Sequence, residues 1–177
     1  RLETYTPEWP IPKVFRIANN QKVIKGIFEG STINTPSMIC VEDALDGLNW
    51  AEENGGLEFL INTSKKSLNI IYNWVQKNHW VTFLSNNKNI EYLSNTGITF
   101  KISENWFLDK DEEGQRSIVK GICNVLSEEN VAHDINGYPK APPSFRIWGG
   151  ATVDPENVKK LLPWIDWAYK EVKKKYA

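Results

Sequence analysis

Two short segments of the chain carry side chains that could hold an anion. The first contains Asn34 and Thr35, an amide and a hydroxyl directly before Pro36. Thr35 is a typical N-cap and Pro36 suits the first position of a helix, so a helix is predicted to begin here. The free N–H groups and the positive dipole end at such a helix start can bind a phosphate. The alternative is that Thr35 only caps its own helix and Asn34 lies in a turn.

The second segment contains Arg146, one of only four arginines in the chain. In a strand, Arg146 and Trp148 share one face, whereas Phe145 and Ile147 point to the other. Neighbouring prolines and glycines hold the guanidinium stiffly, which favours bidentate binding of a carboxylate. The alternative is a structural ion pair with an acidic side chain. Lys140, six residues earlier on a loop bounded by prolines, is either a second ligand or an exposed surface lysine.

Cysteine catalysis, metal binding and a glycine-rich phosphate loop are not predicted. Cys40 and Cys123 fall within predicted helices, and no recognisable motif joins either of them to a histidine. His133 and Asp134 are adjacent in a predicted strand, so their side chains would point to opposite faces. Two cysteines and two histidines also provide neither a disulfide framework nor a metal-ligand cluster.

Composition excludes several further classes of protein. The 177 residues are 41% hydrophobic and 24% charged, which is typical of a globular protein. The formal net charge is −1, so no general attraction to nucleic acid or to an acidic membrane is expected. No apolar run approaches the roughly 18 residues of a membrane span and no signal peptide opens the chain, so a cytoplasmic location is expected. Because the first residue is Arg1 and not methionine, we expect a segment upstream of it.

The elements that must position these groups follow from periodicity and capping signals. Helices are predicted over residues 35–54, 57–78, 111–129 and 154–175, with strands over residues 80–84, 98–102, 131–135 and 144–148, and a short hairpin over residues 14–24. After residue 78 the order is strand, strand, helix, strand, strand, helix. This order is typical of an α+β layer with helices on one face of a mainly antiparallel sheet. The residues before it have no sheet to cover their apolar side chains, so they look like a piece of a larger domain.

Four motifs together resemble phosphoserine aminotransferases, in the variety found in some bacteria and methanogenic archaea. They are WPIPK (9–13), INTPSM (33–38), GLNWAEENGGL (47–57) and APPSFRIWGGAT (141–152). The resemblance covers essentially the whole chain, in the family's order and spacing. It implies an α/β fold-type I aminotransferase, a cytoplasmic homodimer that uses pyridoxal 5′-phosphate (PLP). Such an enzyme moves an amino group between phosphoserine and 2-oxoglutarate in serine biosynthesis.

The resemblance also implies a domain organisation and site residues. Residues 1–62 would be the C-terminal end of the large PLP-binding domain, and residues 63–177 the connecting helix and the small C-terminal domain. Asn34 and Thr35 would reach the PLP phosphate of the neighbouring subunit, and Arg146 would bind the substrate α-carboxylate. Where many members hold the substrate phosphate with a His-Arg pair, Lys140 is the nearest substitute.

The family's Schiff-base lysine lies upstream of the matched segment, and no lysine of this chain fits its motif. The chain alone is therefore expected neither to retain PLP nor to transaminate. A second hypothesis stays open, in which the α+β part is a stand-alone module that binds a small molecule or a partner protein. A preceding segment with a strand-end lysine would favour the enzyme, and a start codon directly before Arg1 would favour the module.

Overall fold

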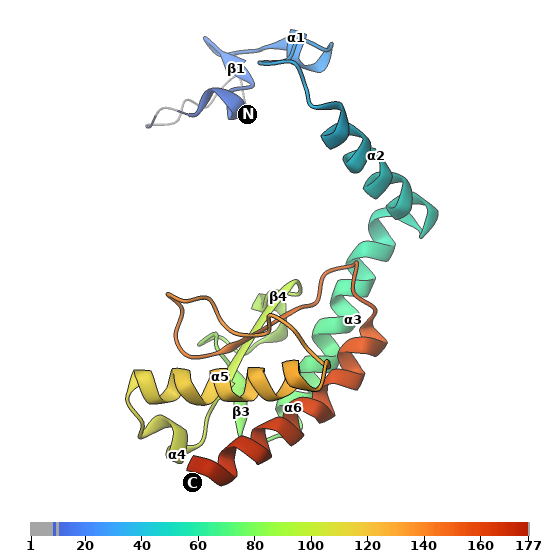
Figure 1. The fold of residues 1–177 in the computed structure, drawn as a ribbon. Helices are drawn as coiled ribbons and strands as arrows, with labels where there is room; N and C mark the ends of the chain where they lie inside the picture. The colour runs from blue at the N-terminus through green and yellow to red at the C-terminus, as the bar shows by residue number, and fades with distance from the viewer. Residues whose placement is uncertain (1–8, 10, 177) are drawn as a thin grey trace. The chain divides into compact units, whose positions relative to one another are not determined.

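The computed structural model describes residues 9 and 11–176. The chain divides into two compact units, Arg1–Trp50 and Ala51–Ala177 (Figure 1). The expected domain boundary at residues 62 and 63 falls inside one continuous helix, α3 (Gly56–Lys77). The assignment of residues 1–62 and 63–177 to two enzyme domains therefore stays a prediction.

The N-terminal unit consists of short elements and one long helix. These are η1 (Lys13–Phe15), β1 (Ala18–Asn19), β2 (Lys22–Val23), α1 (Lys25–Phe28) and most of α2 (Met38–Glu53). The strands β1 and β2 pair antiparallel, which confirms the predicted hairpin. Asn20 and Gln21 form its two-residue turn with φ values of 47° and 60°, the left-handed conformation that such tight hairpins require. None of the described residues up to Trp50 is buried, so these residues form no core among themselves.

Helix α2 begins later than the sequence predicts. Its first residue is Met38, and the carbonyl of Ser37 accepts a hydrogen bond of 3.1 Å from the N–H of Val41. The prediction that Thr35 caps the helix and Pro36 opens it is therefore wrong, because the helical hydrogen bonds start at Ser37. The apolar side of α2 is exposed, and Met38, Leu45 and Leu48 keep 61%, 46% and 63% of their surface accessible.

The C-terminal unit is an α+β layer, as predicted. After α3 come β3 (Val81–Phe83), η2 (Ile90–Tyr92), β4 (Gly97–Ile102), α4 (Asn105–Leu108), α5 (Glu112–Glu128), β5 (Phe145–Trp148) and α6 (Pro155–Tyr176). The sheet order is β3-β4-β5, and both pairs of neighbouring strands are antiparallel. The predicted strand over residues 131–135 is wrong. Asn130 and Asp134 have φ values of 55° and 54°, which break an extended path, and only Asn136 forms an isolated bridge to Phe145.

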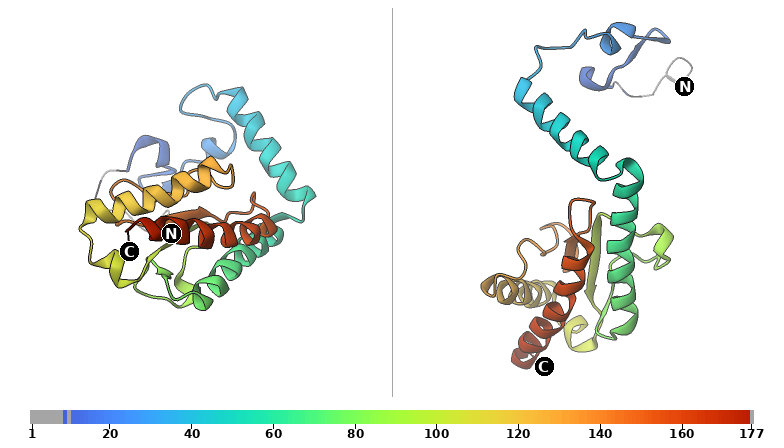
Figure 2. Two further views of the ribbon diagram at one scale, coloured as in Figure 1. Left: turned by 60° about the horizontal axis from the view of Figure 1, so that its bottom comes forward. Right: turned by 90° about the vertical axis from the view of Figure 1, so that its right-hand side faces the viewer.

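The core lies between one face of this sheet and the three long helices α3, α5 and α6 (Figures 1 and 2). Strand β4 shows why, because Ile98, Phe100 and Ile102 are buried while the residues between them are only half-buried. The helices contribute buried residues at helical spacing: Leu68, Ile71 and Val75 in α3, Ile118, Ile122 and Leu126 in α5, and Val158, Leu162, Ile165 and Val172 in α6. On the other face of the sheet, Thr99 and Arg146 are half-buried and Trp148 is exposed.

Two local signals in the sequence explain where the C-terminal helices start. The side chain of Asp111 accepts a hydrogen bond of 2.8 Å from the N–H of Gly114, so Asp111 caps α5, which lies where the sequence predicts a helix. Helix α6 begins at Pro155 and ends among Lys173, Lys174 and Lys175, cations that suit the negative end of the helix dipole. Within the described part of the chain, no helix is long and apolar enough to cross a lipid bilayer.

Candidate functional site

Arg146 lies in β5 on the face of the sheet opposite to Phe145 and Ile147, as the alternation predicts. Its neighbours Phe145 and Ile147 are buried, and Trp148 is exposed. Across the sheet Arg146 is paired with Thr99 of β4. The side chain of Arg146 is only 18% exposed, so its long stem lies along the protein and the guanidinium is partly screened from water.

Two side chains hold the guanidinium of Arg146. Its Nη2 atom lies 3.2 Å from Oδ2 of Asp134, and its Cζ atom lies 4.6 Å from the centre of the Tyr138 ring. The Nε atom is buried and has no hydrogen-bond partner. The structural ion pair that the sequence left open is therefore present. The Asp134 side chain is 87% exposed, however, so this partner lies at the surface.

The loop between Asp134 and Ser144 places both partners of Arg146. The N–H of Arg146 donates to the carbonyl of Ile135 over 2.8 Å, and the N–H of Gly137 donates to the carbonyl of Ser144 over 2.8 Å. A Cβ atom at residue 137 would lie 2.6 Å from Oγ of Ser144, so only glycine allows this close approach.

Asp134 and Tyr138 were not predicted as neighbours of Arg146. Asp134 was expected in a strand beside His133, and Tyr138 was not singled out. The signal that could have identified them is the glycine and proline content of residues 137–143, which is typical of a loop that folds back on the following strand.

Lys140 is exposed and lies apart from the contacts that hold Arg146. It borders a hollow of about 400 Å³ together with Glu112, Gln115 and Arg116 of α5 and the loop residues 141–143. Arg116 anchors the loop to α5, because it donates to the carbonyl of Ala141 over 2.8 Å and pairs with Oε1 of Glu112. In the part of the chain that the structure describes, Lys140 itself makes no hydrogen bond or ion pair, which leaves its ammonium group available to an anion.

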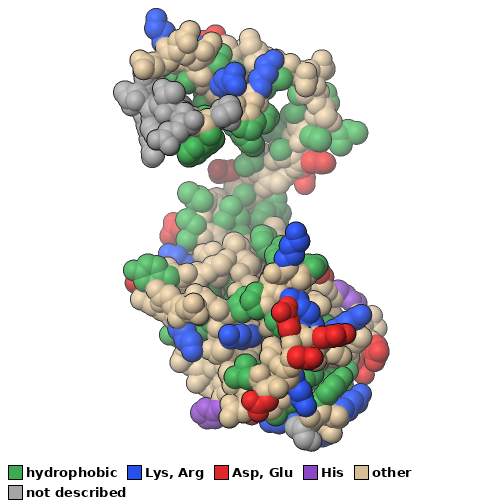
Figure 3. All heavy atoms as spheres, turned by 90° about the vertical axis from the view of Figure 1, so that its left-hand side faces the viewer, with side chains coloured by type: hydrophobic (Ala, Val, Ile, Leu, Met, Phe, Trp, Pro, Cys, Tyr) green, Lys and Arg blue, Asp and Glu red, His purple; other side chains and the backbone are tan. Residues whose placement is uncertain are grey.

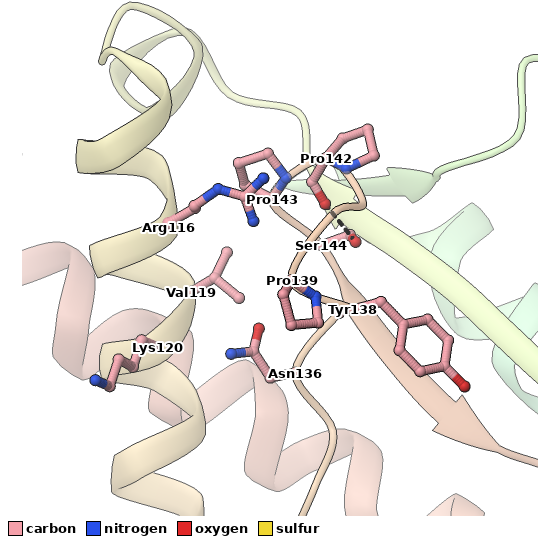
Figure 4. Close-up of a pocket in the computed structure, with 10 residues that line it drawn as sticks. Arg116, Val119, Lys120, Asn136, Tyr138, Pro139, Pro142, Pro143 and Ser144 are labelled. Atoms are coloured by element: carbon pink, nitrogen blue, oxygen red, sulfur yellow. Dashed lines mark hydrogen bonds between the residues drawn. The ribbon is translucent and has the colours of Figure 1, made fainter.

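A second hollow, of about 300 Å³, lies between α5 and the same loop (Figure 4). Val119 and Lys120 border it from α5, and Asn136 and Pro139 border it from the loop. The ring of Tyr138 points away from this hollow (Figure 4). Tyr138 also lines this hollow, but its ring contacts Arg146.

Asn34 and Thr35 lie in the loop between α1 and α2, three to four residues before the helix begins. Both side chains are exposed, and neither makes a hydrogen bond within residues 9 and 11–176. Their amide and hydroxyl groups are therefore available to a ligand. They belong to the N-terminal unit, whereas Arg146 and Lys140 belong to the C-terminal unit, so each pair is positioned only within its own unit.

The remaining nucleophiles and metal ligands have no comparable setting. Burial raises the pKa of the Cys123 thiol to about 12, so its thiolate is scarce at neutral pH. His133 contacts Ser127, with 3.3 Å between Nδ1 and Oγ. Among the described residues, no group of three or more His, Cys, Asp and Glu side chains could hold a metal ion.

Comparison with known proteins identifies the class of protein to which the chain is related. No family model matches the chain. Two curated relatives are each 46% identical over 173 residues, which is 98% of this chain and 44% of the relative. The chain is therefore homologous to a part of aminotransferases, and the α/β architecture and antiparallel sheet agree with this.

The relatives are the phosphoserine aminotransferases of Methanosarcina mazei and Methanosarcina barkeri. The chain spans less than half the length of either, and it corresponds to their C-terminal portion. The resemblance found in the four sequence motifs is thus confirmed.

Proposed function

We propose that this chain is the C-terminal portion of a PLP-dependent aminotransferase that moves an amino group between phosphoserine and 2-oxoglutarate in serine biosynthesis. The observation that carries the proposal is the 46% identity to phosphoserine aminotransferases over 98% of the chain. The complete enzyme would be a cytoplasmic homodimer.

The side chains of this chain fit the acidic groups of PLP and of the substrate. Asn34 and Thr35 are exposed and uncommitted, so they suit hydrogen bonds to the PLP phosphate of a partner subunit. The free N–H groups at the start of α2 follow within the same short segment and favour a negative group. Lys140, also uncommitted, suits the phosphate of phosphoserine.

Arg146 is proposed to bind the α-carboxylate of the substrate. Its side chain is only 18% exposed, its Nε has no partner and its Nη2 is paired with an exposed Asp134, so a carboxylate ligand could take a strong two-point hydrogen bond. This contact would orient the substrate α-carbon toward the cofactor. When bound, PLP supplies the electron sink for chemistry at that carbon, and the protein supplies binding and orientation.

The alternative is a stand-alone binding module built by the C-terminal unit. That unit does have its own core, which such a module needs. The exposed apolar side chains of α2 favour the enzyme, because a helix of this kind needs a covering partner.

A domain graft tests the proposal. This chain replaces the matching 173 residues of the Methanosarcina mazei enzyme, and the hybrid is assayed for PLP absorbance and for transamination of phosphoserine with 2-oxoglutarate. We expect the hybrid to be active. Arg146→Ala should lower its kcat/KM by a factor that corresponds to several kcal/mol of lost transition-state binding, since charged hydrogen bonds contribute about 1.5–3 kcal/mol each. A folded hybrid that retains PLP but is inactive, or one that is indifferent to Arg146→Ala, would contradict it.

A further inference from the structure

The two partners of the Arg146 guanidinium differ in how firmly they are held. Asp134 reaches Nη2 of Arg146 from the surface, and its side chain is 87% exposed. An ion pair to so exposed a carboxylate contributes little to stability, because water competes for both charges. Asp134 can therefore leave the guanidinium at low cost, provided that another negative group takes its place on the largely buried Arg146.

The backbone at Tyr138 is held on both sides, whereas 63% of the residue's surface is exposed. The carbonyl of Tyr138 accepts a hydrogen bond of 2.9 Å from the N–H of Ala141, and the preceding Gly137 is tied to Ser144 over 2.8 Å. These bonds close the loop on both sides of Tyr138. Its ring lies 4.6 Å from Cζ of Arg146, a distance at which a cation over an aromatic face is attracted to it. The ring therefore stands against the guanidinium and favours this position of the cation.

A carboxylate ligand has the same chemistry as the side chain of Asp134. Exchange of one for the other leaves the number of charges on Arg146 unchanged, so no uncompensated charge is created at the partly buried site. The unpartnered Nε of Arg146 gives a ligand with two oxygens a further donor, which the bond from Nη2 to Asp134 does not use.

We propose that Asp134 is a built-in substitute for the substrate carboxylate, which occupies Arg146 in the free protein and gives way when a carboxylate ligand binds. Tyr138 is a positioning residue that keeps the guanidinium in place during the exchange. The proposal rests on the carboxylate-binding role proposed for Arg146. The rival interpretation is that Asp134 serves only to hold its loop against β5.

The test measures binding of 2-oxoglutarate to the complete 177-residue chain by NMR, using the Nε–H signal of Arg146. The chain has four arginines, so loss of one signal in Arg146→Lys assigns it. Asp134→Asn removes the competing charge and keeps the shape, and we expect it to bind the probe about two- to five-fold more tightly. Asp109→Asn, which removes an exposed charge elsewhere in the same unit, should leave the affinity unchanged. Thermal unfolding of each variant shows whether the loop remains intact.

The Tyr138 variants test positioning. Tyr138→Ala should weaken binding about five-fold and broaden the Nε–H signal, whereas Tyr138→Phe should restore both, because it keeps the ring. The proposal would be overturned if Asp134→Asn binds 2-oxoglutarate no more tightly than Asp109→Asn does. It would also be overturned if the Nε–H signal of Arg146 in Asp134→Asn does not respond to 2-oxoglutarate. If Arg146→Gln binds the probe as well as the unaltered chain does, the carboxylate-binding role of Arg146 itself fails. The Arg146→Gln result therefore tests carboxylate binding by Arg146, and the Asp134→Asn result tests the replacement of Asp134 by the ligand.

Discussion

Asp166 of α6 accepts a hydrogen bond of 3.0 Å from the indole N–H of Trp74 on α3. Its second carboxylate oxygen accepts a bond of 3.0 Å from the indole N–H of Trp80, which directly precedes β3. Both indole rings are buried, with 8% and 7% of their surface exposed. One carboxylate therefore satisfies two buried donors and joins the two longest helices of the C-terminal unit.

Substitution of Asp166 should destabilise the chain substantially. In Asp166→Ala both indole N–H groups lose their acceptor, and each unsatisfied buried donor costs about 1–3 kcal/mol, so we expect the free energy of unfolding to fall by about 2–6 kcal/mol. Urea titration followed by tryptophan fluorescence measures this. Asp109→Ala, at an exposed position, is the control. If the two variants unfold at the same urea concentration, the assigned role of Asp166 is wrong.

Glu104 makes the stability of the C-terminal unit depend on pH. Its Oε2 atom accepts hydrogen bonds from Trp106 over 2.6 Å, from Lys173 over 2.5 Å and from Tyr169. Burial by itself raises the pKa of Glu104, but the three donors outweigh it and hold the pKa below its ordinary value. The hydrogen bond to Glu104 in turn raises the pKa of Lys173.

The sign of each effect follows from linkage. A lowered carboxyl pKa stabilises the fold above the pKa of the unfolded state, and this stability is lost as the pH falls through the lowered pKa of Glu104. A raised ammonium pKa stabilises the fold below the unfolded pKa, and this is lost as the pH rises through the raised pKa of Lys173. Glu104→Gln should therefore lower the melting temperature at pH 7, and the difference in melting temperature from the unaltered chain should be smaller at an acidic pH below the ordinary pKa of a glutamate. An equal difference at both pH values would contradict this account.

Removal of the N-terminal unit should leave the C-terminal unit folded. The hydrophobic core lies wholly within residues 68–172, whereas no described residue up to Trp50 is buried. We expect residues 51–177 to unfold cooperatively at nearly the same temperature as the complete chain.

The complete chain should self-associate more than residues 51–177 do, since Ile39 and Leu48 expose 75% and 63% of their surface. Light scattering measures this, and a monodisperse monomer of the complete chain would refute the expected self-association.

The isolated chain should neither retain PLP nor transaminate. A helix-start contact to phosphate contributes about 1 kcal/mol, and neutral hydrogen bonds from Asn34 and Thr35 about 1 kcal/mol each. The sum corresponds to binding no tighter than about the millimolar range. After incubation with PLP and gel filtration, the chain should show no cofactor absorbance. One equivalent of bound PLP with turnover would show that this chain contains a complete site.

The two cysteines should react at different rates. Cys40 is exposed, whereas burial raises the pKa of the Cys123 thiol to about 12. Iodoacetamide at neutral pH should therefore label Cys40 and leave Cys123 unmodified until the chain unfolds. Mass spectrometry of tryptic peptides distinguishes the two sites. Fast labelling of Cys123 in the native chain would mean that helix α5 opens readily.

Much of the fold could be predicted because local patterns and tertiary burial agree. Alternation in residues 98–102 matches the buried face of β4, and Asp111 and Pro155 mark the start of α5 and α6 as expected. The patterns were insufficient where the backbone is irregular. Left-handed residues at 130 and 134 break a stretch whose composition is typical of a strand, and α2 starts at Met38 although Thr35 is the stronger capping signal.

The sequence by itself determined that Arg146 and Trp148 share the strand face opposite to Phe145 and Ile147, and that the chain resembles the C-terminal portion of phosphoserine aminotransferases. Only the tertiary structure placed Asp134 and Tyr138 on the guanidinium. The physical reason is that side-chain alternation is a local property of a strand. The partners of Arg146 depend on how an irregular loop folds back on that strand. This loop contains Asp134 in the left-handed conformation and Gly137, where a Cβ atom would clash with Ser144.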